Sequence, residues 1–244
     1  SAMNYFASLS YDVWCVDMEG YGRSSKHRDI TCDIANGVDD LATATDYIQK
    51  FRGCTDINLY GISSGALRAA AFTEKYPDRV GRLALDAFVW TGKNSPTLVE
   101  RRKKLPEFLK TKRSPIDHAF VQSIFNRDHA DCADPRVVEA FAKAICELDN
   151  SMPNGTYIDM CSHLPLVDPK KILVPTIILR GQYDGIASVS DLLEFFENLP
   201  NQDKQFTVME GISHASFQQK NYEMVYDILE GFWDRARPVY RLPL

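Results

Sequence analysis

One short motif constrains this chain more than any other feature. The G-x-S-x-G sequence at residues 61–65 separates a β-rich run at 57–60 from an alanine-rich helical pattern at 66–76. A serine in a tight turn between a strand and a helix is held in a strained backbone conformation, which presents its hydroxyl at the carboxyl edge of a sheet. We therefore expect a strand–turn–helix unit with Ser63 as a candidate nucleophile.

Strand-like and helix-like runs alternate around this motif. At residues 36–51 apolar side chains follow a period of 3.6 residues, which predicts an amphipathic helix. Helices are also expected at 3–9 and 222–233, and strands at 12–16, 82–85, 172–179 and 205–209. Such alternation indicates βαβ units, so the fold class is α/β, with a mostly parallel sheet and helices on both faces.

The alternation stops between residues 91 and 166. No β-rich run occurs there, and several helical stretches follow one another. Asp134 and Pro135 form a good N-cap and first-turn pair for one of these helices. We predict that residues 91–166 form a helical cap inserted into a core made of residues 1–90 and 167–244.

A serine hydroxyl needs a base to accept its proton and a carboxylate to orient that base. His214 follows the run at 205–209 and is therefore expected at the same edge of the sheet as Ser63. Asp184 follows the run at 172–179. The order Ser, Asp, His is typical of serine hydrolases with a G-x-S-x-G turn, called here the elbow. Asp86, which follows the run at 82–85, is the alternative carboxylate.

The other four histidines lie elsewhere in the sequence. His118 and His129 belong to the helical segment, where we expect solvated or packing side chains. His27 and His163 are possible pocket-lining residues. None of the four lies where a general base is expected.

Two more motifs, together with the elbow and the Ser, Asp, His order, resemble the α/β-hydrolase superfamily in its capped, esterase-like branch. Residues 17–24 match the D-x-x-G-x-G-x-S turn that follows the fourth strand of that superfamily, and residues 76–80 match its Y-P-x-R-V segment after the elbow helix. The resemblance implies that residues 91–166 are a helical lid inserted after the sixth strand. It also implies an oxyanion hole in which the N–H of Ser64 is one donor.

The same resemblance implies three strands that precede residue 1. Members of the superfamily have these strands before the helix in which this chain opens, and the loop after the third strand supplies the second oxyanion donor. We therefore expect an additional N-terminal segment of about 60 to 90 residues, judged from usual domain size.

Charge and composition exclude several classes of function. A net charge of -5 gives no reason to expect nucleic-acid binding, which needs clustered Lys and Arg. The longest apolar run, at 172–179, is interrupted by Pro175 and is too short for stable membrane insertion. The six cysteines contain no C-x-x-C pair, so we expect neither a metal site nor a thioredoxin-like motif, and free thiols favour a reducing, cytoplasmic location. A mechanism based on serine, histidine and aspartate requires no cofactor.

The expected function is hydrolysis of an ester, thioester or amide bond in a small-molecule acyl substrate, through Ser63, His214 and Asp184. Carbon–carbon bond hydrolases, acyltransferases and hydroxynitrile lyases of the superfamily use the same three residue types and are alternatives. A ligand-binding or receptor-like member with slow or no turnover is an alternative from a different class.

Overall fold

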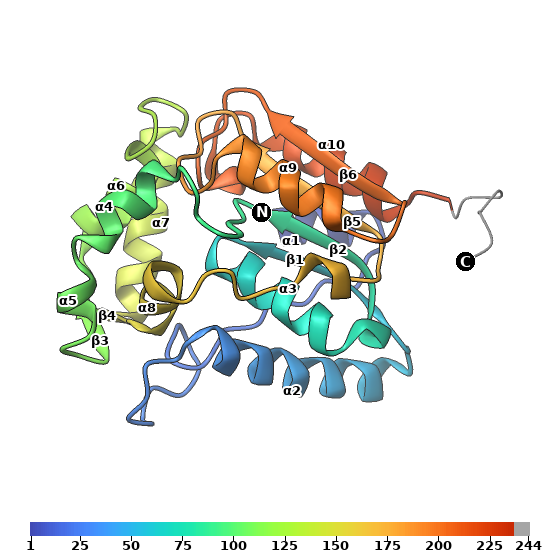
Figure 1. The fold of residues 1–244 in the computed structure, drawn as a ribbon, viewed down its shortest axis with the longest axis horizontal. Helices are drawn as coiled ribbons and strands as arrows, with labels where there is room; N and C mark the ends of the chain where they lie inside the picture. Colours follow the sequence, from blue (N-terminus) through green and yellow to red (C-terminus); the bar gives the residue numbers. More distant parts are fainter. Residues whose placement is uncertain (237–244) are drawn as a thin grey trace.

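The computed structural model describes residues 1–236 and places a four-stranded parallel sheet at the centre of the molecule (Figure 1). The strand order is β1-β2-β5-β6, and the strands are β1 (Ile57–Ile62), β2 (Val80–Asp86), β5 (Thr176–Gly181) and β6 (Lys204–Met209). Ile62 lies opposite Asp86, and Gly181 lies opposite Met209. The carboxyl ends of the strands are therefore nearly level, and the segments that follow them meet at one edge.

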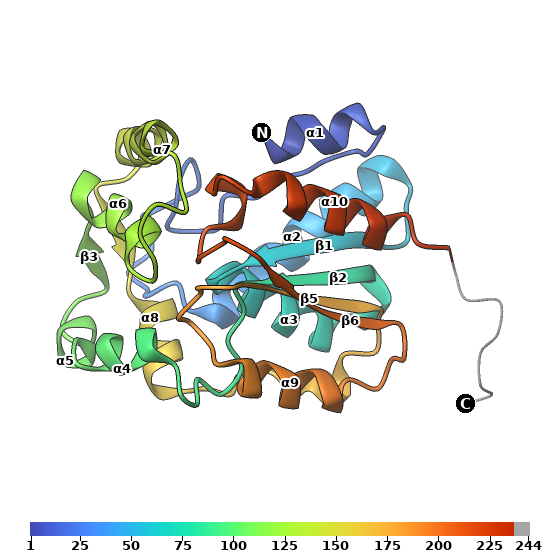
Figure 2. The same cartoon turned by 90° about the horizontal axis from the view of Figure 1, so that it is seen from above.

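Helices cover both faces of this sheet (Figure 2). On one face α3 (Ser64–Lys75) and α9 (Val189–Asn198) pack on the strands, with α2 (Ile34–Arg52) beside α3. On the other face lies α10 (Tyr222–Trp233), with α1 (Ala2–Ser8) against it. Each face has its own cluster of buried apolar side chains, as expected for an α/β domain.

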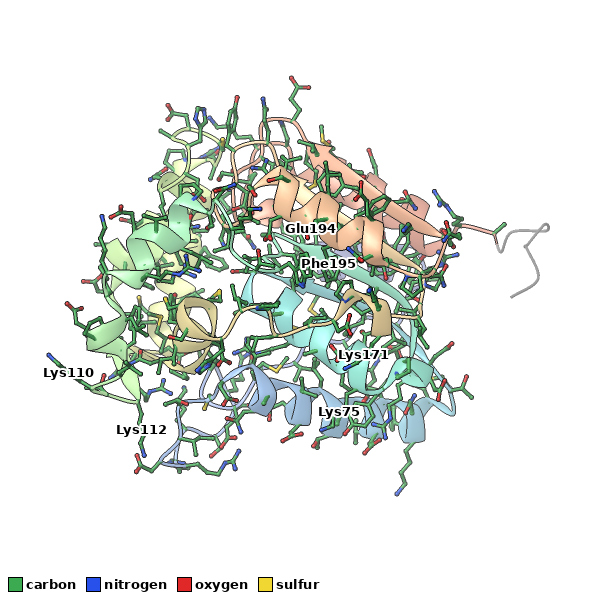
Figure 3. All side chains as sticks on the ribbon, viewed as in Figure 1. Lys75, Lys110, Lys112, Lys171, Glu194 and Phe195 are labelled. Carbon is green, nitrogen blue, oxygen red and sulfur yellow. The ribbon has the colours of Figure 1, made fainter. Side chains whose placement is uncertain are left out.

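The helices are amphipathic, and α9 illustrates this (Figure 3). Phe195 is fully buried, with its ring centroid 4.8 Å from that of Phe88, whereas the neighbouring Glu194 is exposed. Charged side chains such as Lys110 and Lys112 project into solvent. The apolar stripe of α9 therefore faces the sheet, as in most surface helices.

Residues 91–166, called here the insertion, lie at one end of the sheet (Figure 1). They contain α4 (Pro96–Arg102), α5 (Leu105–Phe108), α6 (His118–Asn126), α7 (Pro135–Leu148) and α8 (Gly155–Ser162). As predicted, Asp134 caps α7 and Pro135 begins it. Two short strands were not expected: β3 (Arg113–Pro115) pairs antiparallel with β4 (Ser151–Pro153). Three residues are too few to produce a recognisable alternation of polar and apolar side chains.

Two predicted strands differ from the structure. Residues 12–16 form no strand, because no strand among residues 1–236 pairs with them and an unpaired segment has no ladder of hydrogen bonds. The run at 172–179 becomes a strand only from Thr176, after Pro175, which has no N–H to donate to a ladder. The predicted helices at 3–9, 36–51, 66–76 and 222–233 correspond to α1, α2, α3 and α10.

No helix among residues 1–236 is both long and apolar enough to cross a membrane. The six cysteines are free thiols, and Cys32, Cys132 and Cys161 are buried. Burial raises the pKa of these three thiols, so they stay protonated and poorly reactive at neutral pH.

Candidate active site

Ser63 forms the turn between β1 and α3. Its backbone has φ 56° and ψ −121°, a combination that costs energy for any residue with a side chain. The turn is held by the Ser63 N–H, which donates to the carbonyl oxygen of Asp86 at 2.9 Å, and by the Ser63 carbonyl, which accepts from the N–H of Ala66 at 3.0 Å. Bonds from both neighbouring elements therefore fix the serine at the carboxyl edge of the sheet.

The two glycines of the motif differ in how much space surrounds them. A Cβ on Gly61 would lie 2.3 Å from the backbone oxygen of Gly65, so only glycine allows the strand and the helix to approach this closely. A Cβ on Gly65 would meet no atom within 4 Å among residues 1–236. A close approach of strand and helix therefore requires glycine on the strand side of the serine only.

Ser63, His214 and Asp184 form one chain of hydrogen bonds. His214 Nε2 lies 2.9 Å from Ser63 Oγ, and His214 Nδ1 lies 3.0 Å from Asp184 Oδ1. Because a carboxylate accepts, Nδ1–H donates to Asp184, and the lone pair of Nε2 then faces the serine hydroxyl. His214 is 5% exposed and Asp184 is 2% exposed, so both partners of this bond are shielded from water. The structure brings the three predicted residues together, and their catalytic roles stay a prediction.

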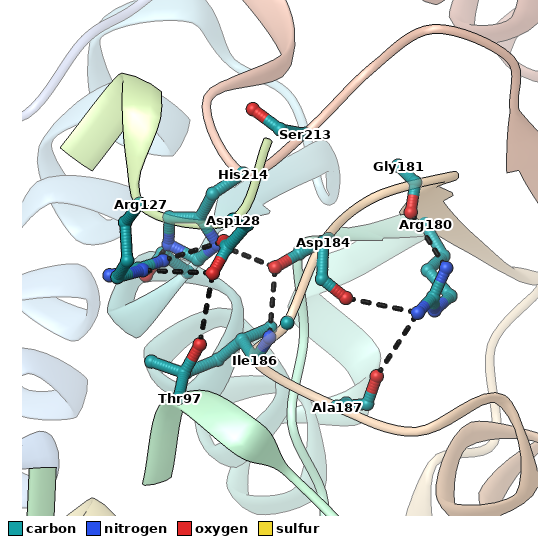
Figure 4. A network of polar contacts seen from close by, with 12 residues as sticks. Thr97, Arg127, Asp128, Arg180, Gly181, Asp184, Ile186, Ala187, Ser213 and His214 are labelled. Atoms are coloured by element: carbon teal, nitrogen blue, oxygen red, sulfur yellow. Dashed lines mark hydrogen bonds and ion pairs between the residues drawn. The ribbon is translucent and has the colours of Figure 1, made fainter. Parts of the chain in front are cut away.

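The loop that carries Asp184 is called here the acid loop (residues 181–187). Local hydrogen bonds, among them those of the preceding residue Arg180, fix its conformation (Figure 4). The Arg180 guanidinium donates to the carbonyl oxygens of Gly181 and Asp184 at 2.8 and 2.9 Å. Asp184 Oδ1 also accepts from the N–H of Ile186 at 3.0 Å. Its other oxygen, Oδ2, is buried and has no hydrogen-bond partner among residues 1–236.

Backbone bonds join the acid loop to the loop that carries His214. The N–H of Gln182 donates to the carbonyl of Met209 at 2.9 Å, and the N–H of Tyr183 donates to the carbonyl of Ile212 at 3.0 Å. The Gln182 side chain returns a bond, since its Oε1 accepts from the N–H of Gly211 at 2.9 Å. The two loops therefore place the imidazole and the carboxylate as one unit.

Asp86, the alternative carboxylate, is fully buried. Its hydrogen bonds within residues 1–236 go to two hydroxyls and not to His214. Its carboxylate accepts from the Tyr60 hydroxyl at 2.6 Å and from Ser216 Oγ at 2.9 Å. Burial raises the pKa of Asp86 to about 7, although the two hydroxyls partly offset this effect. In this geometry Asp184 orients the imidazole, and Asp86 holds the 3₁₀ turn that follows His214.

The N–H of Ser64 lies at the first position of α3, where an N–H has no acceptor within the helix. The positive end of the helix dipole is at the same place. The Ser64 hydroxyl accepts from Arg68 Nη1 at 3.2 Å, which brings a guanidinium close to this turn. These three features favour a negatively charged atom beside Ser63 Oγ.

Sequence analysis missed one acidic residue of the site, Asp128, which follows α6 in the insertion. Ligand atoms of Asp128, Asp184 and His214 all lie within 4.8 Å of one another, a spacing that a metal ion could bridge. However, Arg127 contacts both oxygens of Asp128 at 3.0 Å, and His214 is engaged through both ring nitrogens. Contacts within the protein thus engage Asp128 and both nitrogens of His214, whereas Asp184 Oδ2 has no partner among residues 1–236. No local pattern marks Asp128, because its neighbours in space are distant in sequence.

The remaining histidines do not join this chain of bonds. His118 is exposed, and His163 Nδ1 lies 2.8 Å from Asp159. His27 lines a separate surface pocket. His129 is exposed and stacks on Tyr183 of the acid loop, with ring centroids 3.8 Å apart.

Comparisons with known proteins identify the fold and the family of the chain. No curated protein matches the chain in sequence. Three solved structures share the fold: a monoacylglycerol lipase from Paleococcus ferrophilus (16% identity, 95% of this chain and 86% of that chain, TM-score 0.68), an E-2-(acetamidomethylene)succinate hydrolase (16%, 96% and 87%, 0.67), and a thermophilic esterase from Thermogutta terrifontis (21%, 88% and 77%, 0.63). The family model described as Hydrolase_4, serine aminopeptidase S33, matches residues 1–221. The chain therefore belongs to this hydrolase family of the α/β-hydrolase superfamily.

Proposed function

We propose that this protein is a serine hydrolase that cleaves carboxylic esters of small molecules, or the related thioester and amide bonds, through an acyl-enzyme. The observation that carries the proposal is the continuous path of hydrogen bonds from Ser63 Oγ through His214 to Asp184. A serine hydroxyl is a weak nucleophile on its own, and this is the arrangement that activates it.

In the proposed mechanism Ser63 Oγ attacks the carbonyl carbon of the substrate while its proton moves to His214 Nε2. The carbonyl oxygen becomes an oxyanion beside the N–H of Ser64 at the start of α3. When the intermediate collapses, the leaving group takes the proton from Nε2 and the acyl group stays on Ser63. Water then repeats the same steps and releases the acid.

The comparisons support an ester bond as the substrate bond, because a lipase and an esterase share the fold. The family description, a serine aminopeptidase, is the reason to retain amide bonds in the proposal. Carbon–carbon cleavage, acyl transfer and ligand binding without turnover are alternative uses of the same residues. Free thiols and a net charge of -5 fit a small-molecule enzyme of a reducing, cytoplasmic compartment.

We further propose that the insertion acts as a lid that shapes the substrate pocket. One side chain and one backbone group at the start of α4 reach the acid loop. Ser95 Oγ and the N–H of Thr97 both donate to the carbonyl of Gly185, each at 3.2 Å. The insertion thus begins directly beside the proposed acid, which is where a lid must lie to contact an acyl or leaving group.

A fluorophosphonate probe tests the mechanism, because it reacts with an activated serine whatever the substrate. We expect one adduct per protein by intact mass, located on Ser63 by peptide mapping. Ser63→Ala and His214→Ala should abolish labelling, while Ser190→Ala, which changes an exposed serine of α9, should leave it unchanged. Turnover should fall by about 10⁴-fold or more in the first two variants.

The substrate bond is tested separately, with p-nitrophenyl esters of increasing acyl length, matched thioesters, and aminoacyl p-nitroanilides. Preferred cleavage of the esters supports the esterase assignment, and preferred cleavage of the anilides supports an aminopeptidase. Absence of a Ser63 adduct on the folded wild-type protein would refute the serine mechanism. Saturable ligand binding without turnover would then favour the receptor-like alternative.

A further inference from the structure

The insertion touches both loops of the proposed site through one short segment, residues 127–133, called here the strap. His129 stacks on Tyr183 of the acid loop. Beyond it, the carbonyl of Cys132 accepts from the N–H of Lys220 at 2.7 Å, and Ala133 forms a β-bridge with Gln219. Gln219 Oε1 in turn accepts from Ser213 Oγ at 3.2 Å, one residue before His214. The strap therefore contacts the acid loop directly and the segment of His214 through Gln219.

Asp128 is the charged residue of the strap that faces this pair (Figure 4). Its side chain is 6% exposed, and its carboxylate accepts from Arg127 Nε and Nη2 at 3.0 Å each and from Thr97 Oγ1 at 3.2 Å. A Cβ on Gly185 would lie 2.8 Å from Asp128 Oδ1. The glycine after Asp184 thus leaves room for this second carboxylate.

The carboxylate of Asp128 is ionised at neutral pH. Burial alone would raise the pKa of Asp128, but the hydrogen bonds and the charge of Arg127, together with His214, lower the pKa below its usual value. A negative charge buried within 4.8 Å of an imidazole nitrogen interacts with it far more strongly than in water.

We propose that Asp128 is a positioning residue for the proposed hydrolase reaction: its charge stabilises the imidazolium that His214 becomes when it takes the serine proton, and its carboxylate packs against Gly185 of the acid loop. This inference rests on the proposed function. It gives the insertion a role beyond that of a cover, since movement of the strap would remove a charge from the base.

The charges that face His214 come from three parts of the chain. Asp184 belongs to the acid loop, Asp86 to the end of β2, and Asp128 with its partner Arg127 to the strap. Asp128 is therefore the group whose effect on the base depends on where the insertion lies. Arg127 opposes that effect because its positive charge neutralises part of the carboxylate's field.

Two substitutions in the strap act on this field in opposite directions. Asp128→Asn keeps the shape of the side chain and removes its charge, so protonated His214 becomes less favourable. Arg127→Gln leaves the carboxylate without its cation, so protonated His214 becomes more favourable. Asp131→Asn is the matched control, because Asp131 is an exposed aspartate of the same strap.

We expect Asp128→Asn to lower kcat about 10-fold with little change in KM, and to move the acid limb of the kcat/KM profile to lower pH by about one unit. Arg127→Gln should move that limb to higher pH. The control should change neither quantity. A purely structural role would lower stability and activity in both variants without opposite shifts.

An NMR titration of the His214 imidazole gives a readout that does not need turnover. Its midpoint should fall in Asp128→Asn and rise in Arg127→Gln, relative to Asp131→Asn. Equal midpoints in all three proteins, or a loss of kcat that only follows a loss of thermal stability, would overturn the inference. If Asp128→Asn does not fold, Arg127→Gln carries the test by itself.

Failure of the proposed function has a different signature. In that case the wild-type protein shows no Ser63 adduct and no turnover, whereas the imidazole midpoints still report whether Asp128 acts on His214. A labelled Ser63 with unshifted midpoints would instead refute the role of Asp128 alone.

Discussion

Two aspartates approach the same imidazole from different parts of the molecule, Asp86 from the sheet and Asp128 from the insertion. Asp86 is fully buried and receives two neutral hydroxyl bonds, from Tyr60 and Ser216. Asp128 is also nearly buried, but it is paired with the guanidinium of Arg127. Burial raises the pKa of Asp86 to about 7, whereas Arg127 more than offsets burial and lowers the pKa of Asp128.

The difference shows that the sheet and the insertion hold the site by different means. On the sheet side, backbone contacts and hydrogen bonds from uncharged hydroxyls fix the positions of Ser63 and of the turn after His214. On the insertion side, the acid loop meets one backbone N–H, that of Thr97, and otherwise side chains, among them the ion-paired carboxylate of Asp128. We therefore expect sheet-side changes to cost the most, and insertion-side changes to act mainly through charge.

The largest effect is expected for Gly61→Ala on the sheet side. The new Cβ would lie 2.3 Å from the backbone oxygen of Gly65, which cannot move without displacing the start of α3. We expect labelling of Ser63 by a fluorophosphonate to slow by about 100-fold or more, since small misplacements of catalytic groups have effects of this size. Gly65→Ala is the matched control and should label normally, because its Cβ meets nothing and alanine favours a helix. Equal labelling rates in the two variants would show that the turn around Ser63 adjusts to the added Cβ.

Asp86→Ala should have the next largest effect, on stability. It removes the acceptor of two buried hydroxyls and leaves a cavity, so we expect a loss of about 2–4 kcal/mol in the free energy of unfolding. Asp86→Asn keeps the volume and one acceptor oxygen and should cost less. Chemical denaturation of both variants measures the difference. The contribution of one hydrogen bond is about 1 kcal/mol. If Asp86→Ala lowers the free energy of unfolding by less than this, Asp86 does not stabilise the sheet side.

The two aspartates should also give stability opposite dependences on pH. Because the folded-state pKa of Asp86 is raised, its contribution is fully present below the usual value near 3.8 and is lost as pH rises towards about 7, by at most about 1.4 kcal/mol per pH unit. The lowered pKa of Asp128 gives a contribution that is present above its usual value and is lost as pH falls below it. We expect the unfolding free energy, measured from about pH 3 to 8 to span both pKa ranges, to lose the fall with rising pH in Asp86→Asn. In Asp128→Asn it should lose the fall with decreasing pH. Parallel curves for both variants would contradict the comparison.

The smallest effect is expected for Gly185→Ala on the insertion side. The added Cβ would lie 2.8 Å from Asp128 Oδ1 and 2.9 Å from Thr97 Oγ1, but both atoms end side chains that can rotate away. We expect a cost of about 0.5–1.5 kcal/mol in stability, the scale of an off-rotamer side chain. The acid limb of kcat/KM should move in the same direction as in Asp128→Asn, because the carboxylate is pushed from the base. A slowing of Ser63 labelling as large as that expected for Gly61→Ala would show that the insertion side is as rigid as the sheet.

The same contrast explains what could be predicted from the sequence. The β1 turn, the βαβ units and the level carboxyl ends follow from local patterns, so the α/β-hydrolase fold and the meeting of Ser63, Asp184 and His214 could be expected. Residues 12–16 have a β-rich composition, but a strand also needs a partner, and composition does not report one. Asp128 was missed for a related reason: an aspartate next to an arginine has no distinguishing pattern until the fold places it beside Asp184.

The bonds between the acid loop and the His214 loop have a consequence for local opening. The amides of Gln182, Tyr183 and Gly211 each donate to a group on the other loop. The Gln182 and Tyr183 amides donate to backbone carbonyls, so neither is released to solvent while the two loops stay joined, and both should show the same free energy of opening in deuterium exchange. That free energy then measures how often the acid and the base separate in the resting protein.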